Sequence, residues 1–276
     1  GGSVGANGEL EVGGSGTLSL QGDLTVTGTL DLEDGASLTL AGNTLDLTGG
    51  QLDLAGTHSL DGITTGANTT LQINSSADIS RTDSGTSTIG NLVFNNQSGG
   101  TTNSLGVSNM DLTVTAAPQF SSVSLTQSNG KLTFLDAPAF SNMSSLSVTS
   151  GELILQSGGT ISGSSFTFTS SIFKPSGTVS LTGSSHFMFD SDSSVMLEGD
   201  MTISDEMGNV SWPSLDLNGN ALTLGSNVTD MSVDGAMSIG TGESLNSVTS
   251  NLSLNSTLTI DDGGTLSSGS GQVQIG

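Results

Sequence analysis

The sequence predicts a parallel β-solenoid, a coil in which three short strands make each turn and successive turns stack. Two observations predict it. Residues 24–54 carry an apolar–polar–apolar triplet every six to eight residues, with Gly, Asp, Asn, Ser and Thr between triplets. The triplets then recur along the chain with a period near 21 residues, three to a period. Because side chains alternate across a strand, both apolar ends of a triplet share one face.

The period comes from columns of equivalent apolar residues. They are Leu10, Leu30, Leu52, Leu71 and Leu92; Leu18, Leu38 and Leu60; Val195, Leu215, Met237 and Leu258; and Val210, Met231, Leu252 and Val273. Division of the 276 residues by this period predicts about 13 turns. Parallel crossovers are almost always right-handed, so the coil is expected to be right-handed.

We expect one continuous solenoid over residues 1–276. Residues 1–92 and 195–276 predict regular turns, and residues 93–194 predict less regular, Phe-rich turns. A helical structure is excluded, since apolar residues do not recur at helical spacing and Gly interrupts the chain throughout. A meander of β-hairpins is the main alternative. The period of three triplets favours the coil.

All nine Phe lie between Phe94 and Phe189. Phe166 and Phe168 precede Phe187 and Phe189 by 21 residues each. Rings at the period of the core predict interior ladders rather than a sugar-binding platform. Trp212 does not fit the pattern of apolar–polar–apolar triplets, so this pattern does not require it to be buried and allows it an exposed position.

Charge is unbalanced, with 26 acidic residues against 3 basic ones and a net charge of −23. Nucleic acids need Lys and Arg to displace counterions, so they are excluded as partners, and anionic membranes are disfavoured. The simplest interpretation is that net charge keeps a large β surface soluble. Cysteine is absent, and no run of about 18 apolar residues predicts a membrane helix.

Catalysis has one local candidate, Asp190 and Asp192 near His186, because glycoside hydrolysis uses two carboxylates. Asp and Ser at a strand end more often build a turn. His58 has no partner in the sequence. The sequence therefore predicts no enzyme and assigns no catalytic, cofactor-binding or metal-binding residue.

Calcium is the ligand that stacked acidic turns would suit, since it takes six to eight oxygens. No calcium-loop motif is present, and solvated turns are the simpler explanation. The acidic turns are Glu33–Asp34, Asp190–Asp192, Asp205–Glu206 and Asp261–Asp262.

Ice binding would need an aligned column of outward Thr on a flat face. The middle residues of the triplets mix Thr, Ser and Asp, so we expect no pure Thr column. Hydrated carboxylates in such a column would spoil the face. These residues are Ser19, Thr25, Asp31, Thr39, Asp46, Asp53, Asp216, Thr223 and Ser232.

Triplets run from Leu10 to Ile275 with no helix or charged plug as a cap. An end turn of a solenoid exposes unpaired N–H and C=O groups. We therefore expect either a segment of a longer solenoid or ends that pair with other molecules. The chain begins with Gly1 rather than Met, so we expect a processed product or a segment.

The phrases GTLSLQGDLTVTGTLDL and GNTLDLTGG resemble the passenger regions of secreted bacterial surface proteins, namely autotransporters and filamentous-haemagglutinin-like adhesins. The resemblance implies an exported or cell-surface rod that acts as adhesin, stalk or fibre. We expect a non-enzymatic structural protein that self-associates end to end into a filament, sheath or adhesin shaft. The alternatives are a glycan-binding adhesin segment with the Phe-rich middle as its contact region, a carbohydrate-active enzyme, or an ice-binding protein.

Overall fold

The computed structural model describes residues 2–47, 50–61, 63–82, 86–94, 103–142, 144–183, 185–205 and 209–276. Within these ranges every regular element is a β-strand. The strands stack in parallel at a spacing of about 21 residues and form a β-solenoid of about 12 turns, close to the predicted 13. The predicted fold class is confirmed. The chain divides into two compact units, unit 1 (residues 1–135) and unit 2 (residues 136–276).

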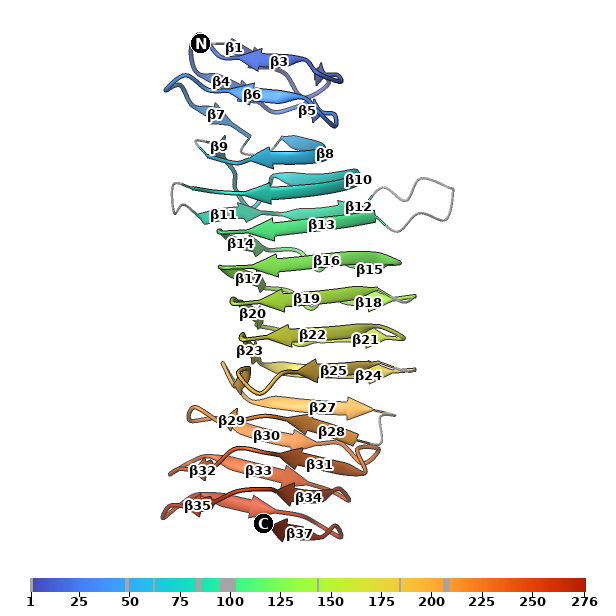
Figure 1. Cartoon of the computed structure of the whole chain (residues 1–276), viewed down its shortest axis with the longest axis vertical. Coiled ribbons are helices and arrows are strands. Elements are labelled where there is room, and N and C mark those ends of the chain that lie inside the picture. The colour runs from blue at the N-terminus through green and yellow to red at the C-terminus, as the bar shows by residue number, and fades with distance from the viewer. Residues whose placement is uncertain are drawn as a thin grey trace. The chain divides into compact units, whose positions relative to one another are not determined.

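Each turn of unit 1 passes through a first, a second and a third strand position (Figure 1). First positions hold β1 (Gly2–Val4), β4 (Leu24–Val26), β7 (Leu45–Asp46), β9 (Ile63–Thr64), β11 (Thr86–Ile89), β14 (Asp111–Val114) and β17 (Lys131–Phe134). Second positions hold β2 (Glu9–Val12), β5 (Thr29–Leu32), β12 (Asn91–Phe94) and β15 (Gln119–Ser121). Third positions hold β3 (Thr17–Ser19), β6 (Ser37–Thr39), β13 (Asn103–Ser108) and β16 (Val123–Ser128). The long strands β8 (Gln51–Ser59) and β10 (Thr70–Ser80) span the second and third positions.

Unit 2 repeats this order. Its first positions hold β20 (Glu152–Leu155), β23 (Ile172–Pro175), β26 (Ser194–Met196), β29 (Leu215–Asp216), β32 (Met237–Ile239) and β35 (Leu258–Ile260). Its second positions hold β18 (Ala139–Ser141), β21 (Gly159–Ser162), β24 (Gly177–Thr182), β27 (Met201–Asp205), β30 (Ala221–Leu224), β33 (Ser244–Ser247) and β36 (Thr265–Ser267). Its third positions hold β19 (Ser145–Thr149), β22 (Ser165–Thr169), β25 (His186–Phe189), β28 (Asn209–Trp212), β31 (Asp230–Val233), β34 (Asn251–Leu254) and β37 (Val273–Ile275).

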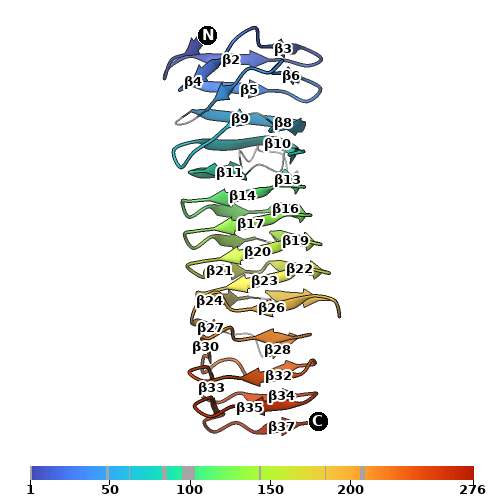
Figure 2. The same ribbon diagram turned by 90° about the vertical axis from the view of Figure 1, so that its left-hand side faces the viewer.

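The strand registers confirm the predicted columns. In unit 1, Leu30 pairs with Leu10 on one side and with Leu52 on the other, and Leu71 continues the column. In unit 2, Val210, Met231, Leu252 and Val273 pair in sequence, as do Val195 with Leu215 and Met237 with Leu258. Figure 2 shows the same stacking from the side, with β14 above β17 in unit 1. The apolar period therefore specifies which residues stack.

The interior is a narrow apolar column. Leu, Ile and Val fill most of it, and in unit 2 the Phe rings pack on one another, as predicted. Phe168 stacks on Phe189 with ring centroids 4.6 Å apart, and Phe166 meets Phe187 edge to face at 5.6 Å. Six Phe are fully buried: Phe120, Phe134, Phe140, Phe166, Phe168 and Phe173.

Trp212 is also fully buried, so its predicted exposure is wrong. It pairs with Val233 in the register of β28 and β31, and it occupies an ordinary inward position. The triplet is Val210-Ser211-Trp212, with an aromatic ring as its second apolar end. Within the described residues its indole Nε1 has no hydrogen-bond partner.

Buried hydroxyls satisfy the backbone at the corners, where ladder hydrogen bonds are interrupted. Thr69 Oγ1 donates to Leu47 O at 2.8 Å and accepts from Gly66 N at 2.9 Å. Ser185 Oγ in unit 2 lies 2.8 Å from Ile161 O and 2.6 Å from Thr182 O. These side chains hold successive turns at a fixed spacing.

Candidate functional surfaces

Asp190, the first catalytic candidate, braces a turn. Its carboxylate accepts hydrogen bonds from Ser170 N at 3.0 Å and from Ser193 Oγ at 2.6 Å. These two hydrogen bonds, the hydroxyl first, lower the pKa of Asp190 below its usual value. A general acid needs the opposite shift. The geometry therefore supports the turn interpretation for Asp190.

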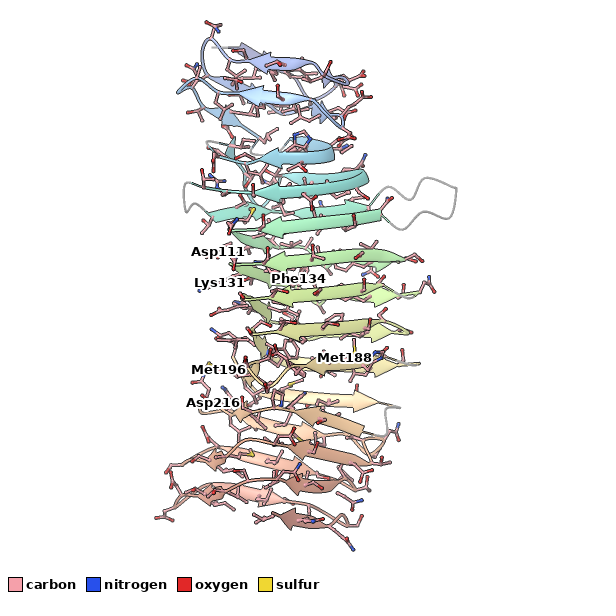
Figure 3. All side chains as sticks on the ribbon, viewed as in Figure 1. Asp111, Lys131, Phe134, Met188, Met196 and Asp216 are labelled. Atoms are coloured by element: carbon pink, nitrogen blue, oxygen red, sulfur yellow. The ribbon has the colours of Figure 1, made fainter. Side chains whose placement is uncertain are left out.

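The same bracing recurs around both units. A carboxylate in one turn accepts a hydrogen bond from a backbone N–H one turn away, at a corner where that N–H lacks a ladder partner. The pairs are Asp23 with Thr44 N, Asp61 with Thr82 N, Asp111 with Lys131 N, Asp200 with Ala221 N, Glu33 with Gly14 N and Glu243 with Gly219 N. Figure 3 shows Asp111 and Lys131 on neighbouring turns at one edge of unit 1. A large share of the acidic residues thus has a structural role as backbone acceptors.

This role of the acidic residues was not predicted from the sequence. The sequence feature that corresponds to this role is an acidic residue in one turn, about one repeat period away from a second turn. The separation between partners varies from 19 to 24 residues, so the pairing cannot be assigned before the register is known.

Two of the acidic turns considered for calcium have a carboxylate engaged in this way, at Glu33 and at Asp190. Glu33 accepts from Gly14 N at 2.9 Å, and the backbone of Asp261 and Asp262 bonds to neighbouring turns. Among the described residues, no three His, Asp or Glu side chains gather as a metal site. The Asp205–Glu206 turn lies outside the described side chains.

The two histidines and the basic residues are also separated. His58 is buried, and its Nε2 lies 2.8 Å from Ala55 O, so it belongs to the local turn. Arg81 is buried and donates to Ser87 Oγ at 3.0 Å. Lys174 lies between Glu152 and Glu198, at 3.2 and 3.5 Å. The two contacts of Lys174 tie neighbouring turns together.

An acidic ladder runs along the second strands of unit 1. Glu11 pairs with Asp31, and Asp31 pairs with Asp53, so three carboxylates point outward at successive turns. Asp53 is only 7% exposed and accepts hydrogen bonds from the amides of Gln51 and Gln72. Burial, followed by the charges of Asp53 and Glu11, raises the pKa of Asp31 above its usual value.

The second strands of unit 2 carry a different surface. Their outward side chains are hydroxyls, two alanines and one amide, with no charged group among them. They are Ala139, Ser141, Thr160, Ser162, Thr178, Ser180, Thr182, Thr202, Ser204, Ala221, Thr223, Ser244, Asn246, Thr265 and Ser267. We call this array the hydroxyl face.

The outward columns contain short runs of Thr within mixed columns, as expected from the mixture of Thr, Ser and Asp in the sequence. In unit 2, Thr178, Thr202 and Thr223 pair across three turns. In unit 1, Thr88, Thr113 and Thr133 pair across three first strands. Elsewhere Thr and Asp do share a column, since Asp46 pairs with Thr25 on one side and with Thr64 on the other. Asp216 of unit 2 pairs with Met196 on a first strand (Figure 3).

The described part of unit 1 includes surface pockets without acidic or basic side chains in their lining. One, of about 250 Å³, is lined by Asn91, Leu92, Val93, Phe94 and residues 116–119. Another, of about 210 Å³, is a polar notch at the corner of Thr27, Gly28 and Gln51. Neither contains a titratable side chain, so neither has acid–base chemistry to offer.

The chain matches no protein family, no curated protein and no solved structure with which it was compared. In the ranges that the structure describes, no helix is long and apolar enough to cross a membrane. Arguments about function therefore rest on the surfaces of the solenoid itself.

Proposed function

We propose that the chain is a non-enzymatic structural protein, a β-solenoid building block of an extracellular filament, sheath or adhesin shaft. The regular stack supports this proposal, because its interior and its corner hydrogen bonds all serve to hold turns together. The extracellular location rests on the resemblance to secreted bacterial surface proteins.

One observation carries the self-association part. The strands β35, β36 and β37 each pair with one neighbouring strand in the described part of the chain, and their other edge presents ladder donors and acceptors. Their apolar side chains are open, with Ile260 46%, Val273 40% and Ile275 55% exposed. An apolar strand edge is a template for a further strand.

A further turn stacked on this edge would bury these side chains as the inner turns bury theirs. In a longer protein that turn belongs to the same chain. For the 276-residue chain alone, a second copy can supply it. Burial of apolar area at about 25 cal/mol per Å² would favour the association.

The test is the size of the purified chain over a range of concentration, by light scattering and electron microscopy, with and without calcium. We expect oligomers or filaments that grow with concentration. A chain that stays monomeric throughout would contradict the proposal.

A matched pair of variants locates the contact. Ile275→Lys places a charge on the open edge of β37, and charged edges block strand pairing. Val248→Lys adds the same charge at a residue that is 53% exposed in a turn. Assembly should fall for Ile275→Lys and persist for Val248→Lys. Equal behaviour of the two variants would argue against stacking at this edge.

A further inference from the structure

The hydroxyl face of unit 2 is a two-dimensional array. The ladder pairs its side chains in register: Thr178, Thr202, Thr223, Asn246 and Ser267 form one column over five strands. Thr160, Ser180 and Ser204 form a parallel column. Strand geometry spaces these groups by about 4.8 Å between turns and about 6.8 Å between outward residues of one strand.

Most of these hydroxyls are available to a ligand. Within the described residues, the side chains of Thr160, Thr178, Thr202, Thr223 and Thr265 have no hydrogen-bond partner in the protein. They are half-exposed or exposed. On this face Ser204 Oγ lies 3.3 Å from Ser180 Oγ, and Asn246 Nδ2 donates to Ser244 Oγ at 2.9 Å. In contrast, the corner hydroxyls of the same unit are buried and bonded.

The positions of the outward hydroxyls are fixed because the inward side chains of the same strands are packed in the core. The inward residues Met201, Leu222 and Leu245 alternate with the outward array and are buried. Thr is β-branched and stiff at its first side-chain torsion. The array is therefore preorganised, and binding costs little in side-chain ordering.

The chemistry of the face excludes most partners. It has no Trp, Tyr or Arg to anchor a protein interface, in which Ser is depleted. It has no Lys or Arg for nucleic acid. Aromatic rings that would stack on a polysaccharide surface are absent from it, because the Phe of unit 2 point inward or lie on third strands.

The kind of ligand that is not excluded is a lattice of hydrogen-bond donors and acceptors. Its repeat distances would have to be close to the spacings between the hydroxyls of this face. Water oxygens in hexagonal ice repeat at similar distances, and each water, like each hydroxyl, both donates and accepts. Charged groups would hold mobile hydration shells, and the described side chains of this face include none, in a chain of net charge −23. We infer that the hydroxyl face of unit 2 is an ice-binding surface.

Binding works through many weak contacts. Each Thr offers a hydroxyl to a lattice water and a methyl group to the space between waters. A single such contact is weak, but the contacts of five aligned strands form together once the first is made. This function does not depend on end-to-end assembly.

The experiment is adsorption of the whole chain to a slowly growing ice surface, together with thermal hysteresis and crystal shape. We expect enrichment in the ice fraction and faceted crystals. Exclusion from ice would overturn the proposal. Binding to crystalline cellulose or chitin without binding to ice would also overturn it, in favour of a polysaccharide surface.

Two variants in one turn test the face. Thr223→Tyr on β30 raises a bulky group above the array, whereas Ser232→Tyr on β31 adds the same group to the neighbouring third strand. Ice adsorption and hysteresis should drop several-fold for Thr223→Tyr and stay unchanged for Ser232→Tyr. Thr202→Tyr on β27 gives a second test of the same column. Equal losses on both faces would contradict the assignment.

Discussion

The second strands of the two units share one backbone frame and present opposite surfaces. In unit 1 they carry Glu11, Asp31 and the buried Asp53 in line, and in unit 2 they carry Thr202 and Thr223 in line. The inward residues are equivalent, with Leu columns under each surface. The comparison teaches that stacking is specified by the inward residues, which leaves the outward columns free to carry different chemistry.

Removal of an inward Leu should have the largest effect and should not depend on the surface above it. Leu30 in unit 1 and Leu222 in unit 2 are both fully buried with paired neighbours on both sides. Leu30→Ala and Leu222→Ala should each cost about 2–5 kcal/mol, because a cavity adds to the lost transfer free energy. Denaturant unfolding, combined with hydrogen exchange of the strand concerned, measures both. A cost near zero for either variant would show that the two frames are not equivalent.

These inward columns are the part of the fold that the sequence predicts well. Leu10, Leu30, Leu52 and Leu71 share a column because one apolar face must be buried at every turn, and a shift of one residue would expose it. Trp212 was missed because a large ring next to Pro213 hid an ordinary triplet. Burial of the Trp212 ring depends on the interior volume available at this turn, and the repeat period of the sequence does not give that volume.

The outward surfaces could not be predicted to the same degree. Register separations range from 18 residues, for Leu45 and Ile63, to 28, for Ala77 and Leu105. A change of one residue in a spacer moves the following outward column. The sequence therefore shows that Thr and Asp both occupy triplet middles, but the strand register is needed to show that Asp31 and Thr223 belong to separate ladders on the second strands of the two units.

Loss of a buried corner hydroxyl should give the second-largest decrease in the free energy of unfolding. Thr69→Val removes a buried group that joins Leu47 O and Gly66 N. The unpaired backbone groups should cost about 1–3 kcal/mol in free energy of unfolding. Thr70→Val is the control, since Thr70 lies beside it on the outward side of β10 and is half-exposed. Equal costs for the two variants would show that the corner hydrogen bonds do not stabilise the turn.

The acidic ladder should make the stability of unit 1 depend on pH. The pKa of Asp31 in the folded chain is raised above 3.8, its usual value, so the folded state holds the proton more tightly than the unfolded state. The contribution of Asp31 is therefore most favourable below about pH 3.8 and is lost as pH rises through the folded-state pKa.

Asp31→Asn should remove this dependence and stabilise unit 1 at pH 7 by a few tenths to about 1 kcal/mol, the size of a like-charge cross-strand pair screened by solvent. The measurement is denaturant unfolding between pH 3 and pH 7, with hydrogen exchange of β5. Thr223→Asn on the hydroxyl face is the matched control and should change the pH profile little. A wild-type stability that rises over this window at β5 would contradict the assigned sign.

The smallest effect should come from building a carboxylate ladder on the hydroxyl face. Thr202 and Thr223 pair directly, as Asp31 and Asp53 do in unit 1. Each single change to Asp should alter stability by less than about 0.5 kcal/mol, since the new charge is hydrated and its neighbours are neutral.

The double variant should lose about 0.2–1 kcal/mol more than the sum of the two single changes, because like charges then lie directly opposite each other. Unfolding of all four proteins in a double-mutant cycle gives this coupling. It should shrink in high salt and at pH values where the carboxylates are protonated. A coupling of zero at low salt would mean that the spacing between turns does not by itself create the electrostatic cost of the acidic ladder. The cost would then come from the burial of Asp53 beside Gln51 and Gln72.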